Sequence, residues 1–260
     1  MKKEFLYRYV SFETFVGMVQ NSALTFVLPS VWEDPYEAKP FYTLIKNTDD
    51  IVKKLFLLSI FHKTYCQSWT TLAESDAMWR IYSYNCRALR ISVCKDKIKL
   101  LENIDVIPIR YEDNFDTSST ENNYDKFIDS LAKKRSAFEH EQEIRLISCF
   151  KFKDTDDAER HIKAWLGISG NPDAIDFVEN LFPSLVPDEQ ATKICELLNI
   201  GANARTTKDI SFKHISNFID GVMVHPQAPD WYCKIVKDFC TINGVNYEGK
   251  SKLYSNSVDL

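Results

Sequence analysis

Short hydrophobic runs alternate with polar stretches along the chain, and their periodicity predicts a mixture of strands and helices. Runs rich in β-branched and aromatic residues are typical of strands. We expect strands at FLYRYV (5–10), ALTFVLP (23–29), TYCQSWT (64–70), RALRISV (87–93), DVIPIRYE (105–112), IDGVMVHP (219–226) and NYEGKSKLY (246–254). Helical periodicity and capping residues predict helices at 12–21 after Ser11, 49–62, 75–84 from Ser75, 123–138, and 229–240 with Asp230 as cap.

The mixed order of strands and helices predicts one α+β domain that spans residues 1–260. Its length and its 45% hydrophobic residues are enough for a sizeable core. Residues 155–209 differ from the rest of the chain in their hydrophobic pattern. The pattern is helical and is interrupted by Pro172, Pro183 and Pro187. We therefore expect a helical insertion at 155–209 within the domain.

Composition narrows the classes of partner. The net charge of −5 argues against broad binding to the phosphate backbone of nucleic acids. The seven cysteines form no C-x-x-C pair, which favours reduced thiols. No apolar run approaches the roughly 18 residues of a membrane span, and the N-terminal MKKEFLYRYV lacks the apolar stretch of a signal peptide. We expect a cytoplasmic protein without membrane association.

The segment HEQEIRLISCF (140–150) alternates with a period of two. As a strand it places Glu141, Glu143 and Arg145 on one side. Either this face is solvated and one glutamate pairs with Arg145, or one carboxylate points into a cleft and acts on a sugar. The sequence alone leaves both interpretations open.

Polar and aromatic residues also accompany other predicted elements. Arg8 lies on the first strand, and Ser68 and Thr70 lie on the third. Arg8 is either a surface arginine or a fixed guanidinium for phosphate. Trp79 and Tyr82, three residues apart on a predicted helix, either pack in the core or form an aromatic wall for a flat ligand.

The spacing of residues gives no support for a metal site, a phosphate-binding glycine loop, a serine nucleophile or a nuclease. The five histidines lie far apart, without the spacings of zinc ligands, so no metal site is predicted. A Walker loop, a G-x-G-x-x-G motif and a G-x-S-x-G elbow are all missing from the sequence. A nuclease would need a metal-chelating carboxylate cluster or a catalytic histidine pair, and neither spacing is visible.

Four ordered motifs resemble the bacterial family called domain of unknown function 2971. They are LYRY near the start, NSALTFVLPSVWEDPYE (21–37), YCQSW followed by MWRIYS (65–83), and F-x-x-E-x-E-x-R at 138–145. The resemblance covers about residues 5 to 147 and, more weakly, IDGVMVHP. The chain departs from the family where it has Trp-Glu-Asp-Pro for Phe-Asn-Asp-Pro, Gln-Ser for Phe-Ser, and Phe138 for Trp.

A looser resemblance concerns the order of the polar groups. A basic residue on the first strand, a hydroxyl on a middle strand and Glu-x-Glu on a late strand are similar to the layout of ADP-ribosyltransferases. The resemblance implies a split, twisted pair of small mixed or antiparallel sheets flanked by helices, with NAD in the cleft between them. It also implies cleavage of the nicotinamide–ribose bond by a bacterial toxin or defence effector. Water as acceptor gives an NAD glycohydrolase, and a protein or nucleic acid gives a transferase.

The same resemblance assigns roles to residues of this chain. Glu143 or Glu141 would be catalytic, because a carboxylate stabilises the positive charge that develops at the anomeric carbon. Arg8 would hold the phosphates or the nicotinamide-side ribose, and Ser68 would support the strand and the ribose. The remaining cofactor contacts would be hydroxyl and aromatic side chains: Tyr7, Thr70, Trp79 and Tyr82.

A non-enzymatic binding or effector module is the alternative. In that case the loop Trp32–Tyr42 and the helix with Trp79 and Tyr82 form an aromatic recognition groove. The Glu-x-Glu-x-Arg run would then be a structural ladder of ions.

Overall fold

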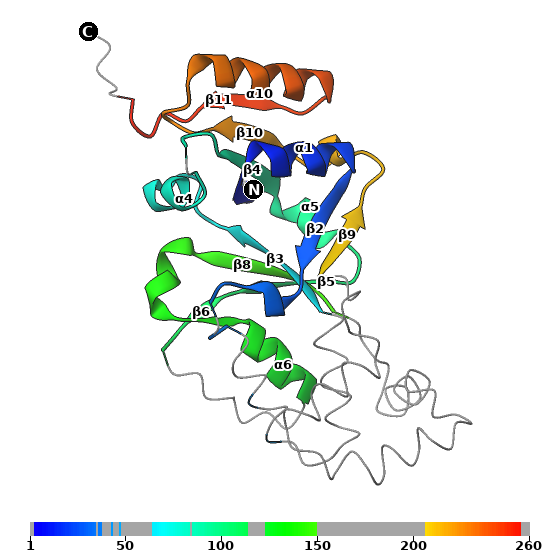
Figure 1. Ribbon diagram of the computed structural model, residues 1–260. Coiled ribbons are helices and arrows are strands. Elements are labelled where there is room, and N and C mark those ends of the chain that lie inside the picture. The colour runs from blue at the N-terminus through cyan, green and yellow to red at the C-terminus, as the bar shows by residue number, and fades with distance from the viewer. Residues whose placement is uncertain are drawn as a thin grey trace.

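The computed structural model describes residues 3–34, 36–37, 43, 47, 64–83, 85–113, 123–149 and 206–255. They form a mixed α/β structure with a large, mainly antiparallel sheet and few helices (Figure 1), which confirms the predicted mixture of elements. The strands are β1 (Phe5–Val10), β2 (Ala23–Val27), β3 (Tyr65–Thr70), β4 (Leu89–Cys94), β5 (Ile104–Pro108), β6 (Arg110–Tyr111), β7 (Lys133–Lys134), β8 (Glu143–Ser148), β9 (Thr207–Ser211), β10 (Gly221–Val224) and β11 (Tyr247–Lys250). The α-helices are α1 (Phe12–Gln20), α4 (Asp76–Ile81), α5 (Lys95–Lys99), α6 (Asn123–Leu131) and α10 (Asp230–Ile242), and the 3-10 helices are η1 (Pro29–Val31), η2 (Ser136–Glu141) and η5 (Ile215–Asn217).

Strand β3 is the branch point of the sheet, because different strands pair with its two edges. β8 pairs with all six residues of one edge. The other edge is shared, since β2 pairs with it at Cys66 and β1 pairs with it at Thr70. β1 and β2 therefore diverge from the two ends of β3, and we call the region between them the fork.

The expected pair of small sheets is one nine-stranded sheet in the structure. Its order is β11-β10-β4-β1-β3-β2-β9, with β8 on the second edge of β3 and β5 beyond β8. β10 and β11 run parallel, and the other pairs among the described strands of this sheet are antiparallel. The two halves stay connected because β3 forms hydrogen bonds on both edges. β6 and β7 form a separate parallel pair.

The main hydrophobic core lies between one face of this sheet and the two helices α1 and α10. Alternate residues of the central strands supply the sheet side, among them Leu6, Val10, Leu89, Ile91, Val222 and Val224. α10 buries Tyr232, Val236 and Cys240, which recur every four residues on one stripe of the helix. Phe15 of α1 packs edge-on against Phe239 of α10, with ring centroids 5.6 Å apart. The core thus fixes β1 and β4 beneath the two helices.

Both serine caps that the sequence predicts are confirmed. The Ser11 hydroxyl accepts a hydrogen bond from the Thr14 backbone N–H at 3.2 Å and starts α1. The Ser75 hydroxyl accepts one from the Met78 N–H at 3.3 Å and starts α4. These caps satisfy backbone donors that the first turn of a helix leaves free.

Several predicted helix boundaries are wrong. α4 ends at Ile81 and not at 84. α6 ends at Leu131 and not at 138, because Lys133–Lys134 pair with β6 as strand β7. α10 has Pro229 as its N-cap, so Asp230 lies in the first turn instead of capping the helix. A carboxylate there still favours the helix dipole.

Part of the prediction lies outside the described residues. This applies to the helix at 49–62, to residues 35 and 38–42 of the predicted recognition loop Trp32–Tyr42, and to most of the insertion at 155–209. Residues 207–209, the end of that predicted insertion, belong to strand β9, which pairs with β2. Within the described part of the chain, every helix is too short or too polar to cross a bilayer.

Candidate functional site

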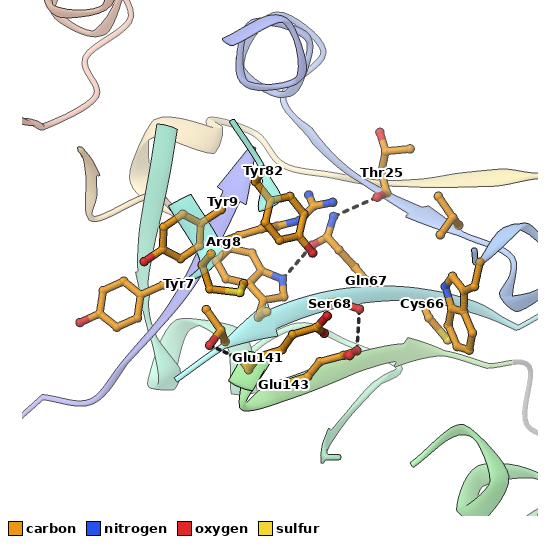
Figure 2. A pocket seen from close by; sticks show the side chains of 15 residues that line it. Tyr7, Arg8, Tyr9, Thr25, Cys66, Gln67, Ser68, Tyr82, Glu141 and Glu143 are labelled. Carbon is orange, nitrogen blue, oxygen red and sulfur yellow. Dashed lines mark hydrogen bonds between the residues drawn. The ribbon is translucent and has the colours of Figure 1, made fainter. Parts of the chain in front are cut away.

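A cavity of about 190 Å³ lies at the fork (Figure 2). Seven of the eight predicted site residues line it: Tyr7, Arg8, Ser68, Thr70, Tyr82, Glu141 and Glu143. The other lining residues include Thr25, Val27, Trp32 and Gln67. Three segments that are distant in sequence therefore contribute a guanidinium, hydroxyls and carboxylates to one place.

The cavity collects side chains from both faces of the sheet. Residues directly opposite each other in antiparallel strands project from the same face. Thr70 is opposite both Tyr7 and Glu143, so these three side chains share a face. Ser68, two residues before Thr70, shares it as well, whereas Arg8 follows Tyr7 and projects from the other face. The fork lets one cavity reach both sets (Figure 2).

Arg8 brings a positive charge that the described residues do not compensate. Its side chain is half-buried, and burial lowers the pKa of the guanidinium to about 10, which leaves it charged at neutral pH. None of the described residues forms a hydrogen bond or an ion pair with it. A guanidinium beside a cavity, without a counter-ion, is a binding group for an anion.

Glu143, the first residue of β8, is 3% exposed. Its Oε1 accepts hydrogen bonds from Ser68 at 2.6 Å and from Arg145 at 2.8 Å, and its Oε2 accepts one from Lys134 at 3.2 Å. Burial alone raises the pKa of Glu143, but the charges of Arg145 and Lys134 outweigh burial and lower it to about 2. The wall of the cavity therefore holds a carboxylate that is ionised at neutral pH.

Glu141 reaches the same cavity from η2 and not from the predicted strand. Gln142, with φ of 41°, ends η2 before β8 begins, so the strand periodicity predicted for Glu141 and Glu143 is wrong at this point. Lys134 bridges the two carboxylates, with its Nζ 2.6 Å from Glu141 and 3.2 Å from Glu143. The Thr70 hydroxyl donates to the Glu141 carbonyl at 2.6 Å and ties this turn to β3.

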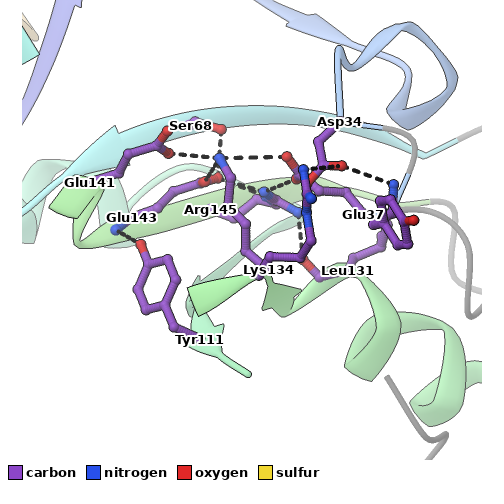
Figure 3. Close-up of polar contacts among 11 residues, drawn as sticks. Asp34, Glu37, Ser68, Tyr111, Leu131, Lys134, Glu141, Glu143 and Arg145 are labelled. Atoms are coloured by element: carbon purple, nitrogen blue, oxygen red, sulfur yellow. Dashed lines mark hydrogen bonds and ion pairs between the residues drawn. The ribbon is translucent and has the colours of Figure 1, made fainter. Parts of the chain in front are cut away.

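Arg145 connects Glu143 to the loop after β2 (Figure 3). The residue is 1% exposed, and its guanidinium donates to Glu143 at 2.8 Å, to Glu37 at 2.6 Å and to the Leu131 carbonyl at 2.7 Å. The Trp32 ring covers it, with the centroid 4.1 Å from the guanidinium carbon. The solvated face predicted for Glu-x-Glu-x-Arg is therefore wrong, because Glu143 and Arg145 are buried, whereas the predicted pairing of one glutamate with Arg145 is confirmed.

A second ion pair holds the same loop. Arg135 donates to the two carboxylate oxygens of Asp34 at 3.0 and 3.1 Å, and the Tyr36 ring lies 4.7 Å from its guanidinium. Sequence reasoning missed Glu37 and Lys134, because no periodicity marks them as buried. Arg145 was the one signal in the sequence that pointed to Glu37. An arginine buried within an apolar strand requires a counter-charge, which can come from elsewhere in the chain.

Gln67 holds the fork together where backbone pairing is interrupted. Its side-chain Nε2 donates to the Thr25 carbonyl of β2 at 2.9 Å, and its Oε1 accepts from the Trp69 indole at 2.9 Å. The amide thus bridges β2 and β3 beside the single residue pair that joins them. The sequence contained no signal for this role.

The two aromatic residues predicted as a wall have different environments. Trp79 is fully buried and packs edge-on against Tyr9, with ring centroids 4.8 Å apart. Its indole N–H donates a hydrogen bond to the Glu74 carboxylate at 2.9 Å. Trp79 does not line the cavity and serves the core. Tyr82 is 43% exposed and lines the cavity.

The volume of the cavity limits its occupant. Sites that enclose a whole small molecule usually measure about 300–1,000 Å³, so about 190 Å³ admits one ring or one sugar group. The rest of a nucleotide would lie outside this cavity. Within the described residues, no cluster of His, Cys, Asp and Glu side chains could hold a metal ion.

Comparison with known protein families, with curated proteins and with solved structures finds no match to this chain. The two resemblances drawn from the sequence motifs therefore stay predictions. The site has to be interpreted from its own geometry.

Proposed function

We propose that this protein cleaves the nicotinamide–ribose bond of NAD, as an ADP-ribosyltransferase-like enzyme or an NAD glycohydrolase. The observation that carries the proposal is the meeting of Arg8, Ser68 and Glu143 at one cavity, from three strands of a forked sheet. The ordered motifs shared with the domain of unknown function 2971 family support a relation to that bacterial family. A role as a toxin or defence effector acting in the cytoplasm belongs to the same proposal.

The carboxylate of Glu143 suits this reaction. Departure of nicotinamide leaves positive charge on the ribose, and a nearby carboxylate stabilises that charge only while it is ionised. The Arg145 and Lys134 charges keep the pKa of Glu143 at about 2, and the Ser68 hydroxyl orients it. In the proposed reaction, Glu143 stabilises the ribosyl cation and Glu141 contacts the ribose hydroxyls or the acceptor.

Arg8 and the tyrosines supply the binding groups. The charge of Arg8 fits a phosphate of the dinucleotide, because no described residue neutralises it. Tyr82 is partly exposed at the cavity and offers a ring on which nicotinamide can stack. Trp79 has no part in this proposal.

A second candidate is a non-enzymatic module that binds an anion at the fork. The observation that favours it is the complete pairing of Glu143, whose two oxygens are already bonded to Ser68, Arg145 and Lys134. A carboxylate in this state also serves as a structural ion. Arg8 and Tyr82 would then form the recognition surface, in place of the Trp79 helix face.

The test is release of nicotinamide from NAD by the purified protein, with Glu143→Gln as the variant. We expect a rate loss of about 100-fold or more, because the variant removes charge at the reacting centre. Glu37→Gln is the matched control, since Glu37 belongs to the same ion network but does not line the cavity. Both variants weaken the network, and Glu143→Gln alone should abolish turnover by the folded protein.

Two results would overturn the enzymatic proposal. One is equal turnover by wild type and Glu143→Gln at equal folded fraction. The other is NAD binding that Arg8→Gln abolishes, without any release of nicotinamide by the wild type. The second result would establish the binding module instead.

A further inference from the structure

A second cavity lies away from the Glu143 carboxylate, between the start of α1, the segment that follows α4, and the first turns of α10. Its volume is about 410 Å³, which is larger than the cavity at the fork and within the range of about 300–1,000 Å³ that is typical of small-molecule sites. The residues that decide its chemistry are Phe12, Glu13, Asn85, Arg87, Trp231 and Tyr232.

One wall of this cavity is aromatic and rigid. Tyr232 packs edge-on against Phe12 and Trp231, with ring centroids 5.9 Å away in both cases. The Tyr232 hydroxyl also donates to the Arg87 carbonyl, which fixes this segment against α10. Trp231 itself is 53% exposed, so a flat ligand can reach its indole ring.

The polar groups of the cavity are unequally available. The Glu13 carboxylate accepts hydrogen bonds from its own backbone N–H and from Ser11, and these bonds, together with the nearby Arg87 charge, lower its pKa. The guanidinium carbon of Arg87 lies over the Trp231 ring, 4.9 Å from the ring centroid. Arg87 has no ion-pair partner within the described part of the chain. The Asn85 side chain is exposed and has no hydrogen-bond partner there either. The Arg87 guanidinium lies over the Trp231 ring and near the Glu13 charge, but it has no ion pair or hydrogen bond among the described residues, so it and the Asn85 amide can still donate to a ligand.

We infer that this second cavity binds a planar aromatic anion of the nucleoside monophosphate class. The base stacks on Trp231, the phosphate pairs with Arg87, and the Asn85 amide hydrogen-bonds to the edge of the base. Stacking on an exposed aromatic ring and charge pairing with arginine together recognise a base that carries a phosphate. Tyr82 lines both cavities, but none of the groups assigned to this ligand takes part in the NAD chemistry proposed for the fork.

Calorimetric titration of the purified full chain with AMP tests the inference, with adenosine as the uncharged counterpart. We expect Trp231→Ala to weaken the binding of both probes about tenfold, because stacking is lost. Arg87→Gln should weaken the binding of AMP and leave the binding of adenosine unchanged. Trp231 and Arg87 are exposed, so both variants should melt at the wild-type temperature.

Two control variants distinguish binding in this cavity from binding on the outer surface of α10 or at the fork. Ile242→Ala removes an exposed apolar side chain of the same helix outside the cavity, and Arg8→Gln alters the cavity at the fork. Neither should change the component of AMP binding that Trp231→Ala weakens. The inference is overturned if AMP fails to bind at millimolar concentration, if Trp231→Ala binds it as wild type does, or if Arg8→Gln abolishes binding. None of these results bears on nicotinamide release, which the Glu143 variants test separately.

Discussion

Arg145 and Arg8 lie on strands that pair with opposite edges of β3, and their surroundings differ completely. Arg145 on the β8 side donates to Glu143, Glu37 and a backbone carbonyl. Arg8 on the β1 side has no hydrogen-bond or ion-pair partner among the described residues. Burial lowers the pKa of both guanidinium groups, but the two glutamates reverse this effect for Arg145 and raise its pKa.

The two arginines show the difference between charges that stabilise the fold and a charge that can bind a ligand. On the β8 side each buried charge has an opposite charge within hydrogen-bond distance, so those ions hold the loop after β2 against the sheet. On the β1 side one positive charge remains for a ligand. The fork allows this difference, because β1 and β2 pair with opposite ends of β3 and Arg8 lines the cavity there.

The largest expected effect comes from Arg145→Met. The substitution leaves the buried Glu143 and Glu37 carboxylates without their shared partner, and such a loss destabilises proteins by about 3–5 kcal/mol. We expect this decrease in the free energy of unfolding in urea denaturation. Arg8→Met is the matched control, and it should leave stability unchanged or raise it, because it removes a partly buried charge that has no partner among the described residues.

Equal destabilisation by the two methionine variants would contradict the comparison. It would mean that Arg8 has a structural partner outside the described residues, and that the proposed anion site at the fork is occupied by the protein itself. Binding of NAD to Arg145→Met at low temperature would test the same difference between the two arginines. A folded fraction that still binds NAD places recognition on the Arg8 side.

The second largest expected effect is a loss of stability in acid that comes from the titration of Glu143. The pKa of Glu143 falls from its ordinary value of 4.5 to about 2 on folding, so its contribution is complete above about pH 4.5 and is lost as the pH falls toward 2. Between about pH 5 and about pH 3 the expected loss is about 2 kcal/mol. The free energy of unfolding of Glu143→Gln, measured over this range, should fall less steeply.

Glu37→Gln is the control for that measurement, because its pH dependence should change in the opposite direction. Burial raises the pKa of Glu37, and the Arg145 and Lys134 charges only partly oppose the effect. Protonation of Glu37 in acid therefore favours the folded state, and Glu37→Gln should lose stability more steeply than wild type on acidification. Identical pH profiles for the two variants would show that Glu143 is not the ion that the network stabilises.

Much of the candidate site could be predicted because its residues lie on strands with clear local patterns. The runs around Arg8 and Ser68 identify two strands, and the segment after Glu143 identifies a third. Their meeting could not be derived from periodicity, since it depends on β3 pairing with β1 and β8, which lie far apart in sequence. The resemblance in the order of polar groups supplied that step.

The errors have physical causes. Trp79 and Tyr82 are three residues apart, which places them on one helix face only if the helix continues. α4 ends at Ile81, so Tyr82 turns out to the cavity while Trp79 stays in the core. The sequence pattern predicts Lys134 in the helix 123–138, but Lys134 belongs to β7, which pairs with β6, and its Nζ contacts Glu143. Local propensity could not reveal a strand of two residues whose partner is distant.

The smallest expected effect comes from Ser68→Ala, which removes one of the hydrogen bonds to Glu143. We expect a loss of about 1 kcal/mol near neutral pH, together with a shift of the acid transition to higher pH, because this bond helps to lower the pKa of Glu143. Ser130→Ala is the matched control, since the Ser130 hydroxyl donates to the Phe127 carbonyl and to no carboxylate. Both variants should lose similar stability in urea denaturation at neutral pH, and Ser68→Ala alone should change the pH profile. An unchanged profile would mean that Arg145 and Lys134 suffice to keep Glu143 ionised, and that Ser68 is free to bond to a ligand in the cavity.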